Sequence, residues 1–273
     1  MAVNGKPECV YGTFLIGDDY AKGVLALYRS IRATKTIHPF VVFACDCSNN
    51  TIEKLRGSGC RVLNIESLTP PTIIMKKNRL AGFERWNNTF SKLRILSFVQ
   101  FKKIILLDSD MMVQNNIDHL FDEHHMSAVA AGKLTRPNWT DLNSGLMVIK
   151  PSKLEFHRAL EMLQTISSDP SELNKYPKGI GDQDIIQALY PNWPETAELH
   201  LSESYNLFQD CLTRYERLGL INTEDVHVIH FELNPKPWSY TPLSYIQILF
   251  RCIRFRSTAE LKALRKYSSY LKD

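Results

Sequence analysis

The stretch KIILLDSD, residues 103–110, decides how this chain is expected to fold. Its aliphatic run predicts a strand over residues 103–107 that is buried on both faces, as is typical of parallel sheets covered by helices. The run ends at Asp108 and Asp110, two carboxylates that can converge on one cation at the end of the strand. Such hard oxygen ligands suit Mg²⁺ or Mn²⁺, which also bind phosphate oxygens. A D-x-D triplet is common in solvated turns as well, so the triplet alone leaves both interpretations open.

Strand-like and helix-like segments alternate in front of this stretch. Short apolar runs predict strands, and apolar residues at helical spacing predict helices between them. This alternation predicts an α/β fold, in which a mostly parallel sheet is flanked by helices. Ligands of such sheets lie beyond the carboxyl ends of the strands, here at residues 17–20 and 108–110. The predicted strands are 10–16, 40–44 and 61–65, and the predicted helices are 20–33 and 51–56.

The rest of the chain carries the same kinds of segment less regularly. An amphipathic segment over residues 89–101 precedes the strand at 103–107. Beyond it we predict strands at 146–149 and 226–231, helices at 152–165 and 182–190, and a polar loop at 167–180. Residues 69–88 contain Pro70-Pro71 and a basic stretch, and they predict a long loop. Because long loops in compact domains are usually functional, we expect residues 76–88 to close over a bound ligand.

We predict one domain over residues 1–240 and a basic, helical C-terminal tail over 241–273. The apolar run at 246–250 is far shorter than the ~20 residues that a membrane span needs. We expect it to be a core segment. The N-terminus has no basic segment followed by an apolar one, so no signal peptide is expected.

Composition excludes several classes of function. The net charge is +4, and basic residues are interleaved with acidic ones, which does not indicate a nucleic-acid-binding protein. The six cysteines fit no zinc or redox spacing, and a chain of 273 residues does not need disulfides. We therefore expect reduced thiols and a cytoplasmic protein.

Three further groups of residues offer chemistry. Asn143-Ser144-Gly145 supplies donors and acceptors for sugar hydroxyls together with a glycine that allows close approach, although an ordinary turn would look the same. Asp182 and Gln183 open a helix, where Asp182 can be an N-cap. His230 offers a third metal ligand, and Lys236 can reach a phosphate, although a lone histidine on a strand is usually a core residue.

Taken together, these motifs resemble glycosyltransferase family 8, which includes glycogenin and galactinol synthase. They occur in the family's order and at similar spacings, from about residue 10 to residue 238. The matching residues are Asp18-Asp19-Tyr20-Ala21-Lys22-Gly23, Phe90-Ser91-Lys92-Leu93, Asp108-Ser109-Asp110 with Asn116-Ile117-Asp118-His119-Leu120-Phe121, Asn143-Ser144-Gly145, Gly181-Asp182-Gln183, and His230-Phe231 with Lys236-Pro237-Trp238.

The resemblance implies a GT-A type, Rossmann-like fold and a retaining transfer of glucose or galactose from a UDP-sugar. It implies Mn²⁺, with Mg²⁺ as the alternative, held by Asp108, Asp110 and His230. It places Phe14, Leu15 and Tyr20 at the uracil, Lys92 at the donor and Lys236 at the diphosphate. It also implies that the remaining site residues, Ser109, Asn143, Ser144, Gly145, Asp182 and Gln183, bind the donor, with Gln183 and Asp182 as the catalytic pair.

Some positions depart from the family. Leu233 stands where glycogenin has a glycine after its metal-binding histidine, and Gly17 stands where an asparagine contacts the base. Thr213 stands at the self-glucosylated position of glycogenin, with Tyr215 nearby. Self-glycosylation is therefore not expected.

Three functions remain open at this point. The first is hexosyl transfer to a carbohydrate or polyol hydroxyl, with no nucleic-acid partner and no membrane span. The second is a non-catalytic module that binds a nucleotide or a carbohydrate. The third is a metal-dependent nucleotidyltransferase, which gives no reason for Asn143–Gly145 or for Asp182 and Gln183. Association into homo-oligomers is open, and the sequence does not identify the acceptor.

Overall fold

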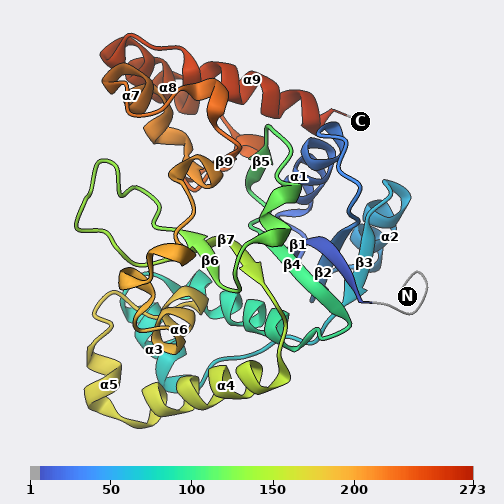
Figure 1. The fold of residues 1–273 in the computed structure, drawn as a ribbon, viewed down its shortest axis with the longest axis vertical. Helices are drawn as coiled ribbons and strands as arrows, with labels where there is room; N and C mark the ends of the chain where they lie inside the picture. Colours follow the sequence, from blue (N-terminus) through green and yellow to red (C-terminus); the bar gives the residue numbers. More distant parts are fainter. Residues whose placement is uncertain (1–6, 273) are drawn as a thin grey trace.

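Six strands form the central sheet, in the order β3-β2-β1-β4-β7-β6 (Figure 1). The structure, a computed structural model, describes residues 7–272. Strands β3, β2, β1 and β4 run parallel to one another, β7 is antiparallel to β4, and β6 is antiparallel to β7. This confirms the predicted α/β fold with a mostly parallel sheet. The strands are β1 (Glu8–Ile16), β2 (Phe40–Cys45), β3 (Arg61–Asn64), β4 (Phe101–Leu107), β6 (Ser127–Val129) and β7 (Asn143–Ile149).

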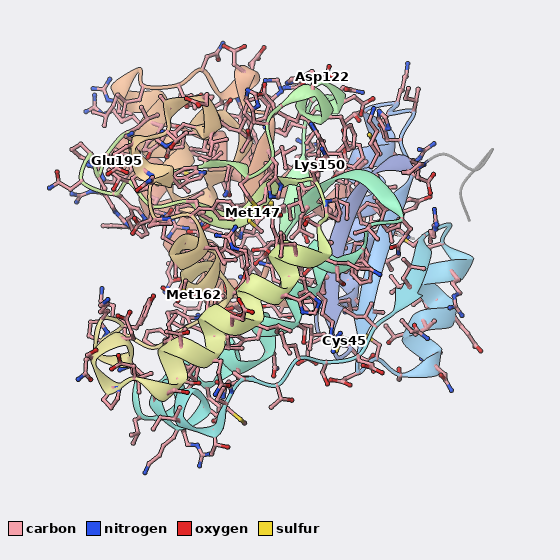
Figure 2. All side chains as sticks on the ribbon, turned by 60° about the horizontal axis from the view of Figure 1, so that its bottom comes forward. Cys45, Asp122, Met147, Lys150, Met162 and Glu195 are labelled. Carbon is pink, nitrogen blue, oxygen red and sulfur yellow. The ribbon has the colours of Figure 1, made fainter. Side chains whose placement is uncertain are left out.

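Helices cover both faces of this sheet, because alternate residues of each strand point to opposite sides. In β4, Ile104 and Leu106 belong to a first core, and Ile105 and Leu107 belong to a second, all four fully buried. Met147 of β7 lies in the first core and Met162 packs against it (Figure 2). The first core includes α4 (Lys153–Ser168), α6 (Asp182–Leu189) and the 3-10 helix Glu84–Ser97, and the second includes α1 (Ala21–Ala33) and α2 (Asn49–Gly57).

A second, three-stranded sheet lies beyond the carboxyl end of β4. Its order is β5-β9-β8, with β5 (Met111–Val113) antiparallel to β9 (Val228–His230) and β8 (Leu207–Phe208) parallel to β9. A third core joins this sheet to α7 (Leu212–Leu218), α8 (Pro242–Phe255) and α9 (Ala259–Leu271). The ring of the buried Tyr267 lies 4.6 Å from that of Phe231. The predicted C-terminal helices are thus present and packed, while the domain boundary at residue 240 stays a prediction.

The prediction of a long loop over residues 69–88 is wrong. A helix, α3 (Thr72–Leu80), begins directly after Pro71, and a 3-10 helix follows from Glu84. Proline is tolerated before and within the first turn of a helix, because the backbone N–H that it lacks has no partner there anyway. The side chain of Asn78 is fully buried and ties α3 to Ile180 through two hydrogen bonds of 2.8 Å. Because most of residues 76–88 are helical and tied to Ile180 through Asn78, the structure gives no basis for expecting them to close over a ligand as a free loop.

Two further expectations need correction. The polar loop predicted at 167–180 contains a short helix, α5 (Pro170–Asn174). The run at 246–250 is not a core segment as a whole, because Ile248 is buried but Ile246, Leu249 and Phe250 are exposed on α8. Within residues 7–272, none of the helices combines the length and the apolar character that crossing a membrane requires.

Helix α1 approaches the turn after β4 so closely that only glycine fits at position 23. A methyl group built on Gly23 would lie 2.5 Å from the carbonyl oxygen of Ser109 and 2.7 Å from the ring of Trp238. The Ser109 atom belongs to backbone, which cannot move aside as a flexible side chain can. Helix α1 therefore sets the position of the Asp108–Asp110 turn.

We predict that Gly23→Ala destabilises the protein by about 1–3 kcal/mol, although alanine is the better helix former, because overpacking outweighs propensity here. Thermal or urea unfolding measures this change. Gly57→Ala in α2 is the matched control, since a methyl group there meets nothing within 4 Å. An unchanged or raised stability for both variants would contradict the close packing at Gly23.

Candidate active site

The Asp108–Asp110 triplet forms a tight turn at the carboxyl end of β4. The backbone N–H of Met111 donates to the carbonyl of Asp108 at 3.1 Å, and β5 starts at Met111. The N–H of Asp108 donates to the carbonyl of Gly145 on the neighbouring strand β7 at 2.8 Å. The turn is therefore fixed by backbone hydrogen bonds on both sides, and its two carboxylates project beyond the sheet.

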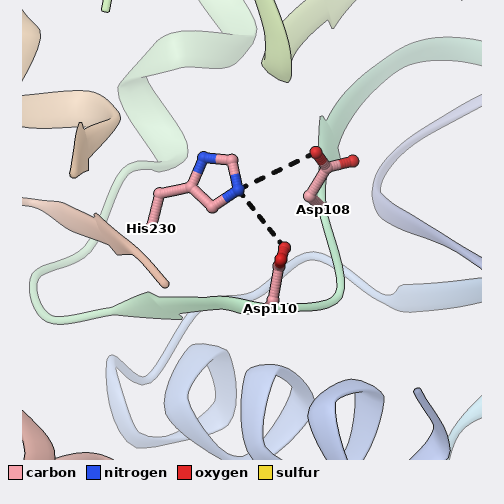
Figure 3. Close-up of side chains that lie close together, drawn as sticks. All are labelled: Asp108, Asp110 and His230. Atoms are coloured by element: carbon pink, nitrogen blue, oxygen red, sulfur yellow. Dashed lines mark ion pairs between the residues drawn. The ribbon is translucent and has the colours of Figure 1, made fainter. Parts of the chain in front are cut away.

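Strand pairing brings His230 to this turn. Met111 of β5 faces His230 of β9 in the antiparallel register, and the N–H of Phe231 donates to the carbonyl of Asp110 at 2.9 Å. Figure 3 shows the Nε2 atom of His230 directed at both carboxylates, 3.3 Å from Asp110 and 4.0 Å from Asp108. One ligand atom from each of the three side chains lies within 4.8 Å of the others. Two carboxylates and one imidazole form a donor set that fits Mn²⁺.

A chain of hydrogen bonds fixes which nitrogen of His230 faces the carboxylates. The N–H of Gly145 donates to the Oδ1 of Asn143 at 3.0 Å, so this atom is an acceptor. Asn206 donates its amide N–H to the same oxygen at 2.7 Å, which leaves the Oδ1 of Asn206 as the acceptor 2.9 Å from Nδ1 of His230. Nδ1 therefore carries the proton, and the lone pair of Nε2 is directed at the metal position, as is usual for metal-binding histidines.

Two lysines pair with the carboxylates of this site. Lys92 contacts Asp108 at 2.8 Å and Asp182 at 3.1 Å, and Lys236 contacts Asp110 at 2.7 Å. Burial alone would raise the pKa of Asp110, but His230 and Lys236 hold that pKa well below its ordinary value. Burial alone would lower the pKa of Lys92, but Asp108 and Asp182 raise it. Lys92 and Asp110 are therefore charged at neutral pH.

The same carboxylates act on His230. Burial alone would lower the pKa of His230, but Asp110 and Asp108 raise it. The raised pKa favours a proton on Nε2 of His230. A metal ion can bind at Nε2 only after this proton is lost, so a metal ion and a proton would compete for the site.

These side chains open into a cavity of about 470 Å³. This volume lies in the range of pockets that enclose small ligands. Ten of the residues predicted for the site line it: Phe14, Tyr20, Lys92, Asp108, Ser109, Asp110, Ser144, Asp182, His230 and Lys236.

Four predicted residues lie away from the cavity wall. The side chain of Leu15 belongs to the second core, beneath α1. Asn143 orients His230 through Asn206, and a methyl group on Gly145 would lie 2.9 Å from the His230 ring. Gln183 accepts a hydrogen bond from the backbone N–H of Ser144 at 3.1 Å. Asn143 and Gly145 thus support His230, a candidate metal ligand, and Gln183 supports the cavity residue Ser144.

Several residues that build the site, in the cavity wall or behind it, carry no recognisable motif. Asn206, which orients His230, follows a 3-10 helix in a region without periodicity. Thr89 accepts the N–H of Asp182 at 3.1 Å and so caps the start of α6 from another element. These contacts join distant segments, and no local pattern predicts them. Sequence reasoning missed Ile16, Glu232 and Asn234 altogether. The remaining lining residues fall in segments expected at a ligand, Asp19 in 17–20 and Arg85, Trp86 and Asn88 in 76–88, but were not named as site residues.

A mostly parallel sheet that ends in paired carboxylates, with a histidine brought alongside, defines a glycosyltransferase of the GT-A fold. The chain belongs to glycosyltransferase family 8: the sequence profile described as "Glycosyl transferase family 8" matches residues 13–242. This confirms the predicted fold, family and enzyme class.

Relatives and solved structures agree with this assignment. Galactinol synthase 4 of Arabidopsis thaliana is 30% identical over 275 residues, which cover 88% of this chain and 76% of that protein. Glycogenin-1 of Homo sapiens is 29% identical over 235 residues, with 84% of this chain and 62% of that protein covered. The solved structure of the galactosyltransferase LgtC with donor and acceptor sugar analogs has a TM-score of 0.56 at 18% identity. It covers 92% of this chain and 95% of LgtC and shows a shared fold.

We predict that Asn206→Ala lowers the affinity for Mn²⁺ by roughly 10- to 100-fold, because His230 loses the acceptor that fixes its tautomer. Titration calorimetry of Mn²⁺ in the presence of UDP measures this change. Asn222→Ala, which removes an exposed asparagine that caps the turn at Thr223–Asp225, is the control and should bind normally. Equal affinities for both variants would show that the hydrogen-bond chain does not serve the metal site.

Proposed function

We propose that this chain transfers glucose or galactose, with retention, from a UDP-sugar to a hydroxyl of a sugar, polyol or glycan. Mn²⁺ is the proposed metal, with Mg²⁺ as the alternative, and Asp108, Asp110 and His230 are its ligands. The observation that carries the proposal is the arrangement of charges in the cavity beside this ligand set. The free thiols of all six cysteines are compatible with the reducing cytoplasm that we propose as the location.

The cavity has no surplus of positive charge with which to hold a diphosphate. Of the described residues that line it, five are carboxylates: Asp19, Asp108, Asp110, Asp182 and Glu232. The lining cations are Arg85, Lys92 and Lys236, joined by His230 only when that ring is protonated. A nucleotide diphosphate would therefore meet a neutral or negative wall. A divalent cation held by the carboxylates reverses this balance, which is why the site suits a metal-bound nucleotide-sugar.

The two lysines suit the two ends of such a donor. Nζ of Lys236 is held by the carbonyls of Phe231 and Glu232 at 3.0 and 2.9 Å, which directs a permanent charge toward the leaving diphosphate. Lys92 links Asp108 to Asp182 and so couples the metal ligands to the end of the cavity proposed for the sugar. Mn²⁺ at this site would supply the positive charge that stabilises UDP as it leaves.

Aromatic side chains suit the base. Phe14 and Tyr20 line the cavity, and the ring of Tyr20 packs edge-on against Trp238 at 5.3 Å. Nζ of Lys236 lies 5.9 Å from the centre of the Tyr20 ring. A uracil that stacks on Tyr20 would thus carry its diphosphate toward Lys236. The side chain of Leu15 lies in the second core, so in this proposal only the backbone of Leu15 lies beside the base.

The ion pair of Asp182 bears on how retention is achieved. A double displacement needs a carboxylate that attacks the anomeric carbon. The Asp182 carboxylate is buried and lies 3.1 Å from Lys92, which lowers its nucleophilicity. We therefore favour attack of the acceptor on the same face from which UDP leaves. Asp182 in the cavity wall, and Gln183 from its position behind Ser144, would stabilise positive charge on the sugar.

The proposal predicts hydrolysis of UDP-glucose or UDP-galactose in the presence of Mn²⁺, as measured by release of UDP, and faster release once the right acceptor is added. Asp110→Asn should abolish the release, because it keeps the shape of the side chain and removes the charge. Circular dichroism establishes that this variant folds. Full activity in folded Asp110→Asn, or no release with any UDP-sugar, would overturn the proposal and favour a binding module.

We predict that Gln183→Ala lowers kcat by about 10²–10³-fold, with a smaller change in KM, because the amide acts mainly in the transition state. Gln187→Ala is the matched control. Gln187 lies one turn further along α6 and accepts the N–H of Leu142 at 3.1 Å, as Gln183 accepts that of Ser144. If both variants lose the same activity, Gln183 supports β7 and does not contact the sugar.

A further inference from the structure

Helix α8 carries an apolar stripe that faces solvent. Five large side chains form it, with exposed fractions of 63% for Leu243, 60% for Ile246, 45% for Leu249, 64% for Phe250 and 75% for Ile253. Residues at such spacings share one face of a helix. The opposite face of α8 is also apolar and packs through Ile248 and Cys252 onto the third core. The core thus accounts for one face of α8 and leaves the other without a partner among residues 7–272.

Positive charge gathers around this stripe. Residues 241–273 contain seven Lys or Arg and two Asp or Glu, whereas residues 1–240 contain 26 and 27. The net positive charge of the chain therefore resides in its last segment. The acidic Glu260 is buried and paired with Arg251, and Arg254, Arg256 and Lys262 are exposed. Figure 1 shows α8 beside α7 and α9 at the upper edge of the molecule, distant from α4 and α5.

We propose that α8 binds the surface of an anionic phospholipid bilayer. A helix of 14 residues is too short to span a bilayer, but it can lie in the interface with its apolar face among the acyl chains. The arginines beside the stripe reach anionic headgroups, since long basic side chains extend along apolar surface to the water boundary. A second copy of this chain is a poorer occupant, because a two-fold contact through α8 would bring the two sets of arginines together.

Membrane binding through α8 would hold the cavity close to the lipid surface. Helix α8 begins six residues after Lys236, a cavity residue, and the intervening Trp238 packs against Tyr20. The bilayer contact and the cavity are thus joined by a short, packed segment. The binding itself does not depend on the identity of the donor or the acceptor.

Sedimentation of the full chain with large unilamellar vesicles tests this proposal. We expect binding to phosphatidylcholine vesicles that contain about one third phosphatidylserine, weaker binding at high salt, and little binding to pure phosphatidylcholine. The double variant Ile246→Ser/Phe250→Ser should lower the affinity at least ~10-fold, because two large side chains leave the acyl region. Arg254→Gln should lower it about fivefold.

Leu154→Ser is the matched control, because Leu154 is 70% exposed on α4. It should leave vesicle binding unchanged, and melting curves establish that each variant is folded. The proposal is overturned if the chain does not sediment with anionic vesicles, or if Ile246→Ser/Phe250→Ser binds them as the wild type does. It is also overturned if sedimentation velocity in the absence of lipid shows a dimer that this double variant abolishes, since a second copy would then cover the stripe.

Discussion

The pairing of β5 with β9 is the constraint on which the site depends. Asp110 lies directly before β5 and His230 ends β9, so the register that sets Met111 opposite His230 also sets the distance between the ligands. A register slip of one residue would turn His230 to the other face of the strand. The short sheet is held in place by the third core, in which Phe231 packs on Tyr267 of α9. The C-terminal helices therefore help to set the geometry of the candidate metal ligands, although none of their described residues lines the cavity.

Sequence reasoning succeeded where local pattern and tertiary structure agree. The run at 103–107 has to be a strand buried on both faces, and its abrupt end has to place Asp108 and Asp110 at the edge of the sheet, so this part of the site was predictable. It failed at α3, where Pro70-Pro71 looked like a loop and turned out to precede a helix. It could not identify Asn206 or Thr89 as parts of the site, because their partners, His230 and Asp182, are remote in sequence.

Gly145 has a structural role that the sequence alone does not reveal. The sequence suggested that a glycine there allows close approach to a ligand. In the structure, the ring of His230, the side chain of Asn143 and Met111 already occupy the space that a methyl group would need. The residues of the motif Asn143-Ser144-Gly145 therefore have two different roles. Ser144 lines the cavity, while Asn143 orients His230, the candidate metal ligand, and Gly145 leaves room for its ring. Motif residues that appear to contact substrate can instead hold the residues that do.

Charge is divided within this molecule in a way that the overall value of +4 conceals. The cavity carries carboxylates that outnumber its permanent cations, and its lysines are engaged by those carboxylates. The positive excess lies on the C-terminal helices, beside an exposed apolar stripe. If electrostatic attraction alone drew the donor to the protein, the excess would line the cavity. Its location on α8 and α9 agrees with the two proposals made above, in which the cavity gains positive charge from a bound cation and the basic surface acts on a separate, anionic partner.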